Sequence, residues 1–157
     1  MQALADLLTA LPFVGPLRRS VWAYALVNAA HILGIGLLLG AILPLDLRLM
    51  GWRHGPPLST LAAFLSRIAA AGLALAVVTG AVLLSVQPME YLPMPVFRAK
   101  MLLIALALLN LSVLHRARSW RAVQDGGAVT SRVRWAAGIS ALCWLGVLVA
   151  GRMIGFL

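Results

Sequence analysis

Residues 21–43 decide the fold, and they read VWAYALVNAAHILGIGLLLGAIL. The stretch contains no Asp, Glu, Lys or Arg, and its one histidine, His31, lies near the middle. A helix needs about 20 mostly apolar residues to cross the hydrocarbon core of a bilayer. Residues 21–43 are therefore predicted to form a transmembrane helix.

Three further apolar runs follow, separated by short polar segments rich in Gly, Pro and Arg. Together with the first run they predict transmembrane helices over residues 20–45, 62–87, 96–116 and 133–156. Residues 1–16 place leucines at helical spacing and predict a short amphipathic helix at the membrane interface, ended by Gly15 and Pro16. The expected fold is an all-α integral membrane protein, a single four-transmembrane-helix bundle over residues 1–157.

The composition supports a lipid environment. Hydrophobic residues make up 62% of the chain and charged residues only 11%, against about 25% charged in a typical soluble domain. The net charge is +9, but the basic residues lie between apolar runs, as in loops that face lipid headgroups. This pattern argues against a nucleic-acid partner and predicts that the protein interacts with the lipid bilayer.

The distribution of basic residues predicts the orientation. Eight lie on one side of the predicted membrane and five on the other. The first side has Arg48, Arg53, Arg67, Arg116, Arg118, Arg121, Arg132 and Arg134, and the second has Arg18, Arg19, Arg98, Lys100 and Arg152. Because the richer side is normally cytoplasmic, we expect a multi-pass protein of the bacterial inner membrane with both termini periplasmic.

His31 is the best candidate for chemistry, because an ionisable residue within a span is costly and often functional. Asn28 and Gly34 lie three residues to either side of it, on the same helix face. A polar group, an imidazole and a glycine gap on one stripe could accommodate a flat cofactor, and imidazole is a common haem ligand. The alternative is a histidine that packs against a neighbouring helix or handles protons.

Depth in the membrane decides which groups could meet His31. His31 lies about ten residues from the predicted periplasmic end of its helix, and Lys100 about four residues from the periplasmic end of its own. The difference in depth is roughly 8 Å, which the long lysine side chain could largely cover. His115 lies roughly 15 Å away from His31 in the opposite direction, which argues against a bis-histidine pair. Depth therefore places Lys100 within reach of His31 and argues against a pair of His31 and His115 around one iron.

Basic residues at the depth of Lys100 suggest an anion site. Arg98 and Arg152 could pair with the carboxylates of a haem through their guanidinium groups, or could extend to lipid headgroups instead. Asn28 could orient the His31 ring or bond to the cofactor. At the opposite end, a contact of Asp46 with Arg67 or His115 is expected to tie helices together.

Several segments carry a resemblance to known families: residues 26–36, residues 45–49, the segment from Phe97 through Lys100 to Asn110 and His115, and the C-terminal run from Trp144 to Arg152. They resemble a family of small bacterial four-helix membrane proteins of uncharacterised function, over nearly the whole chain. More distantly, the layout is similar to HemJ-type protoporphyrinogen oxidases and CopD-type membrane domains. The HemJ-type resemblance implies haem b at a histidine in an early helix and a lysine that opens a later one, which match His31 and Lys100.

The sequence therefore favours a membrane-embedded protein that binds b-type haem and acts in electron transfer or in the oxidation of a porphyrin or quinol-type substrate. Whether it is an enzyme stays open. The alternative is a cofactor-free accessory or assembly subunit of a larger membrane complex, with other membrane subunits or a second copy of the chain as partners. A transporter or copper-import component is a third interpretation, disfavoured because the six Met residues are scattered.

Overall fold

The computed structural model describes residues 2–52 and 55–156, and within them the chain is helical with no strand. The α-helices are α1 (Gln2–Thr9), α2 (Val14–Arg19), α3 (Val21–Met50), α4 (Leu58–Val86), α5 (Pro88–Tyr91), α6 (Pro95–Arg116), α7 (Arg118–Gln124) and α8 (Ser131–Met153), and a 3₁₀ turn, η1 (Ile154–Phe156), follows. The helices α3, α4, α6 and α8 with η1 are long and apolar enough to cross a membrane. The prediction of an all-helical chain with four such helices is confirmed for these residues.

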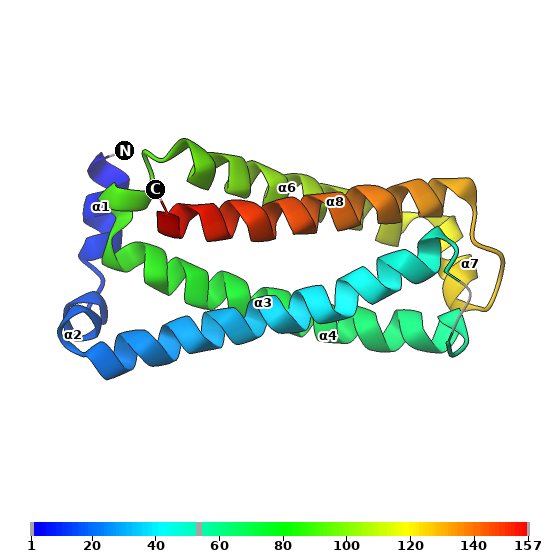
Figure 1. The fold of residues 1–157 in the computed structure, drawn as a ribbon, viewed down its shortest axis with the longest axis horizontal. Coiled ribbons are helices and arrows are strands. Elements are labelled where there is room, and N and C mark those ends of the chain that lie inside the picture. The colour runs from blue at the N-terminus through cyan, green and yellow to red at the C-terminus, as the bar shows by residue number, and fades with distance from the viewer. Residues whose placement is uncertain (1, 53–54, 157) are drawn as a thin grey trace.

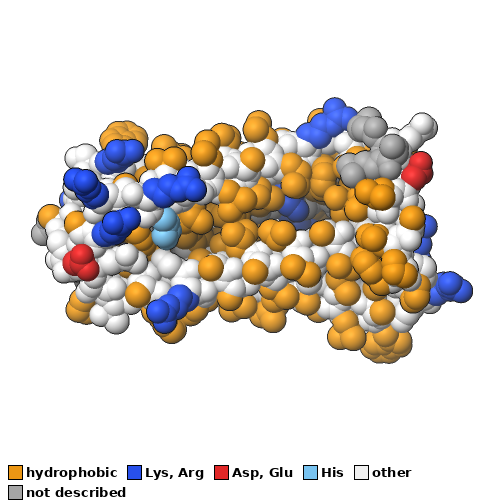
Figure 2. Space-filling model, turned by 180° about the vertical axis from the view of Figure 1, so that it is seen from behind, with side chains coloured by type: hydrophobic (Ala, Val, Ile, Leu, Met, Phe, Trp, Pro, Cys, Tyr) orange, Lys and Arg blue, Asp and Glu red, His pale blue; other side chains and the backbone are white. Residues whose placement is uncertain are grey.

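The four long helices form two antiparallel pairs. Helix α3 crosses α4 along most of its length, and α6 packs against α8 (Figure 1). The two pairs meet through α3 and α8, whereas α4 and α6 make at most marginal contact. Figure 2, which views the molecule from behind, shows a hollow between the two pairs with basic side-chain atoms visible inside it.

Two glycines bring α3 and α4 together. A Cβ added at Gly72 would lie 2.5 Å from the backbone nitrogen of Leu38, and one added at Gly34 would lie 2.7 Å from that of Ala76. Such distances are far shorter than van der Waals contact, so only glycine allows the two backbones to approach this closely. In lipid, where apolar burial does not drive association, this close packing stabilises a helix pair.

Three helix boundaries differ from the sequence prediction by more than a turn, one of them the start of α4 at Leu58 rather than at residue 62. Helix α3 continues through Pro44 to Met50, because the residues beyond the proline, including Leu45 and Leu49, are buried in the core. The N-terminal segment breaks into α1 and α2 around residues 10–13 rather than at Gly15 and Pro16. Pro16 lies in the first turn of α2, where its missing N–H group leaves no hydrogen bond unmade.

Buried side chains form two clusters. One lies at the α7 end of the bundle, where Trp120 and Val123 of α7 belong to the same buried cluster as Leu45 and Leu49 of α3. The other lies at mid-bundle and includes Leu38 and Trp144. Elsewhere the outer surface is apolar, as expected of a surface that faces lipid.

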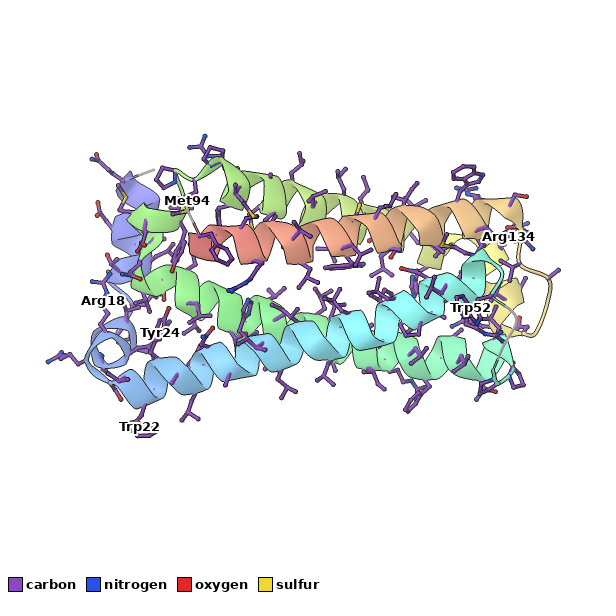
Figure 3. All side chains as sticks on the ribbon, in the orientation of Figure 1. Arg18, Trp22, Tyr24, Trp52, Met94 and Arg134 are labelled. Carbon is purple, nitrogen blue, oxygen red and sulfur yellow. The ribbon has the colours of Figure 1, made fainter. Side chains whose placement is uncertain are left out.

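Tryptophans mark the two ends of α3. Trp22 is 82% exposed at its start, and Trp52 is 61% exposed just beyond its end (Figure 3). The 30 residues of α3 span about 45 Å, close to the thickness of a bilayer with its headgroups. Exposed tryptophans at this separation are typical of the two aromatic belts of a membrane protein.

Helices α1, α2 and α5 and the C-terminal end of the chain lie together at one end of the bundle, and α7 lies at the other (Figure 1). Because the four long helices run up and down the bundle in turn, the first begins and the last ends at the same end of the molecule. Which end faces the cytoplasm stays a prediction from the basic residues, and one of those counted, Arg53, lies outside the described residues.

Candidate functional site

The ring of His31 lies between α3 and α4. It is half-buried, and its Nδ1 is 3.0 Å from the hydroxyl oxygen of Thr79. The same hydroxyl lies 2.6 Å from the backbone carbonyl of Leu75, which can only accept a hydrogen bond. Because the hydroxyl has one proton and donates it to Leu75, His31 Nδ1 must be the donor to Thr79. The neutral imidazole then has its lone pair on Nε2, the atom that can bind a metal.

Gly80 makes room for this imidazole. A Cβ added at Gly80 would lie 3.0 Å from His31 Cε1 and 3.5 Å from Nδ1, so the ring rests against the bare backbone of α4. By contrast, the gap expected at Gly34 is filled by the backbone of α4 near Ala76. The expectation that Gly34 leaves space for a flat cofactor is therefore wrong, because that glycine serves the helix crossing instead.

Lys100 reaches into the bundle from the first turns of α6. Its side chain is half-buried, and its Nζ would lie 3.6 Å from a Cβ added at Gly151 of α8. The side chain of Lys100 also lies in the neighbourhood of His31. Within the described part of the chain, Lys100 has no hydrogen-bond or ion-pair partner. His31 and Lys100 therefore bring two nitrogen donors into the same region, with no acidic side chain paired to either.

The three other predicted site residues lie at the surface. Asn28 is exposed on α3. Arg98 is exposed and its Nε donates to the carbonyl of Leu92 at 3.2 Å. The Arg152 guanidinium is stacked over the Phe156 ring, 4.5 Å from Cζ to the ring centroid. Both arginines lie at the end of the bundle nearest His31, but no contact of the described residues joins Asn28 or Arg152 to His31.

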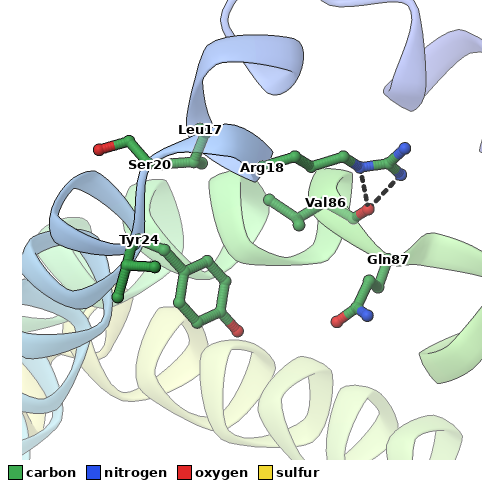
Figure 4. Close-up of a pocket in the computed structure, with 7 residues that line it drawn as sticks. Leu17, Arg18, Ser20, Tyr24, Val86 and Gln87 are labelled. Atoms are coloured by element: carbon green, nitrogen blue, oxygen red, sulfur yellow. Dashed lines mark hydrogen bonds between the residues drawn. The ribbon is translucent and has the colours of Figure 1, made fainter.

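A cavity of about 620 Å³ lies at the same end, between α2, the start of α3 and the end of α4. Figure 4 shows Arg18 above it, with Nε and Nη2 both donating to the carbonyl of Val86, the last residue of α4. Arg18 therefore caps a helix end. Tyr24, two turns before His31, lines the cavity and lies near Tyr91 of α5.

Asp46 is a buried acidic residue near the end of the bundle at which α7 lies. It is 3% exposed and interacts with the side chain of Ser140 of α8, while its Oδ2 has no hydrogen-bond partner in the described residues. The expected contact with Arg67 or His115 does not form there. Instead, His115 Nδ1 donates to the carbonyl of Leu111 at 3.0 Å. Asp46 ties helices together as expected, but the helix it reaches is α8.

Sequence reasoning missed Thr79 and Gly80. A signal was present, because Thr79 is the only polar side chain between residues 69 and 84 of an otherwise apolar helix. Thr79 lies roughly 10 Å from the end of α4, measured along the helix. His31 lies roughly 15 Å from the start of α3, which is at the same end of the bundle. Matching polar residues by depth across the predicted hairpin would have paired the two.

No group of three or more His, Cys, Asp or Glu side chains within the described ranges could hold a metal ion by itself. Comparisons of the chain with protein-family models, with curated proteins and with solved structures find no match. The functional argument therefore depends on the residues of the site, and the family resemblance stays a prediction.

Proposed function

We propose that this protein is a membrane-embedded b-type haem-binding protein, in which His31 Nε2 would bind the iron. The observation that carries the proposal is the hydrogen bond from His31 Nδ1 to Thr79. Histidines that bind a metal nearly always donate their other ring N–H to a fixed acceptor, which holds both the tautomer and the ring orientation. Thr79 is such an acceptor, and the missing side chain of Gly80 lets the ring pack against α4 in this orientation.

Lys100 is the proposed second ligand. Its amine is another nitrogen donor, lies along Gly151, and is not engaged by an acid in the described residues. Arg98 and Arg152 are proposed to pair with the haem propionates, and Asn28 to bond at the cofactor edge. A bound haem would supply one-electron chemistry, which suits electron transfer or the oxidation of a porphyrin or quinol-type substrate. The proposed location is the bacterial inner membrane, with both termini periplasmic.

The test is the haem content of matched variants purified from haem-supplied cells. His31→Ala should lose the haem while keeping the helical circular-dichroism spectrum of the wild type. His115→Ala is the control, because this exposed histidine bonds to the carbonyl of Leu111 in its own helix and packs against Trp120, far from His31. Thr79→Val should weaken haem binding about 10- to 100-fold, since it removes the group that orients the ligand. Equal haem content in His31→Ala and His115→Ala would rule out the proposed ligand.

One observation favours a second candidate, an accessory subunit without a cofactor. Gly36 and Gly40 form a small-residue stripe on α3 with no atom within 4 Å of the Cβ that each could carry. Such a stripe allows close approach of a helix from another membrane protein. A stoichiometric partner that co-purifies with a colourless wild-type chain, and is lost on Gly36→Leu, would support this candidate over the haem protein.

A further inference from the structure

A second cavity lies at the end of the bundle opposite the His31 region. It has a volume of about 760 Å³ and is formed where α6 ends, α7 begins and α8 begins. Its polar lining consists of Arg116, Arg118, Ser119, Thr130 and Arg132. Figure 2 shows basic side chains gathered around this end of the molecule. We refer to these five residues as the arginine pocket.

The charge of the arginine pocket is uncompensated. None of its three arginines forms a hydrogen bond or ion pair with another described residue, and no acidic side chain lines the cavity. The three arginines are exposed to water, but like charges gathered around one cavity still repel one another. An anion in the pocket would remove this repulsion and give the guanidinium groups an acceptor.

Hydroxyl and backbone donors point to the same ligand. The Ser119 Oγ is buried and has no hydrogen-bond partner within the described chain. Thr130 is the N-cap residue of α8 but makes no side-chain capping bond. The N-terminus of this 23-residue helix carries a partial positive charge and unpaired N–H groups. A buried donor without a partner, as at Ser119, is costly, and a phosphate could accept from the exposed arginine, threonine and helix N-terminal donors at once.

The position of the pocket identifies the source of the phosphate. Arg116 is the last residue of α6 and Thr130 directly precedes α8, so the pocket lies where two spans leave the apolar zone. Val113 lines its other edge and is exposed, one turn further into the span, where an acyl chain would run. We propose that the arginine pocket binds the phosphate headgroup of an acidic phospholipid.

The test titrates the purified full-length protein with phosphatidylglycerol or phosphatidylcholine and measures bound lipid by native mass spectrometry. Phosphatidylglycerol should bind more tightly, and Arg132→Gln should weaken its binding about fivefold. Arg134→Gln is the matched control, because it removes the same charge from the same helix end but lies outside the pocket. Ser119→Ala, which changes no charge, should also weaken binding.

Three outcomes would overturn the proposal. Equal weakening by Arg132→Gln and Arg134→Gln would mean that only net charge attracts the lipid. Equal affinity for phosphatidylcholine would remove the preference for an acidic headgroup. If millimolar inorganic phosphate stabilises the protein against heating as much as phosphatidylglycerol does, and Arg132→Gln abolishes both effects, the ligand is a free anion and not a lipid.

Discussion

Gly72→Ala is predicted to destabilise the bundle by opening the crossing of α3 and α4. The added methyl group would lie 2.5 Å from the backbone nitrogen of Leu38 and 2.8 Å from the carbonyl oxygen of Gly34. Both are backbone atoms in the middle of a helix, so neither can move aside alone. The two helices must separate, which also displaces His31 from Thr79 and Gly80.

The magnitude follows from comparison with Gly36→Ala on α3. Extra atoms in a packed interior cost about 1–3 kcal/mol. Alanine is also a better helix former than glycine, by about 1 kcal/mol, but that gain applies to both variants. A Cβ at Gly36 would meet no atom within 4 Å, so this variant has the gain and no clash. The two variants should therefore differ in unfolding free energy by about 1–3 kcal/mol.

The assay is unfolding in mixed detergent micelles by increasing sodium dodecyl sulfate, followed by tryptophan fluorescence. Gly72→Ala should unfold at a lower mole fraction of the denaturing detergent than the wild type, and Gly36→Ala at the same or a higher one. If both variants unfold together, the close crossing at Gly72 is not present in the folded protein, and the argument from the two glycines fails.

Three further results are expected. Ser20→Ala should destabilise the protein by about 1 kcal/mol in the same unfolding assay, because the Ser20 hydroxyl caps α3 by accepting from the Ala23 N–H at 3.2 Å. Asn110→Leu should cost about 0.6 kcal/mol there, since it removes the hydrogen bond from Asn110 Nδ2 to the Ala136 carbonyl that links α6 to α8. Burial raises the pKa of Tyr91 above its usual value of about 10. The neutral phenol therefore stabilises the folded protein fully below about pH 10, and this stabilisation is lost as the pH rises through the raised pKa. Absorbance at 295 nm should therefore show a late-titrating tyrosine that Tyr91→Phe removes.

The transmembrane helices could be predicted from the sequence because lipid excludes charge. An unpaired charge at the centre of a bilayer is costly, so the spans appear as charge-poor runs without any knowledge of packing. Helix ends were less certain. The first span was predicted to end at residue 45, whereas α3 continues through Pro44 to Met50 because Leu49 is buried in the core, which offsets the hydrogen bond that the proline cannot make.

The candidate site was only half predictable. His31 was identifiable because it is a lone ionisable residue in an apolar helix. Its partner Thr79 depends on how α4 is rotated about its own axis, and the contact of Gly34 with Gly72 sets that rotation. Such a contact involves two helices at once, so no pattern within one helix reveals it. For the same reason Asp46 was assigned to Arg67 or His115, while the structure pairs it with Ser140.

The most direct test of the central claim is the absorption spectrum of the wild-type protein, purified in detergent from haem-supplied cells and recorded before and after reduction with dithionite. A haem held by His31 predicts a Soret band in stoichiometric amount, with α and β bands that sharpen on reduction. A folded but colourless protein would contradict the proposal and leave His31 as a residue that packs α3 against α4.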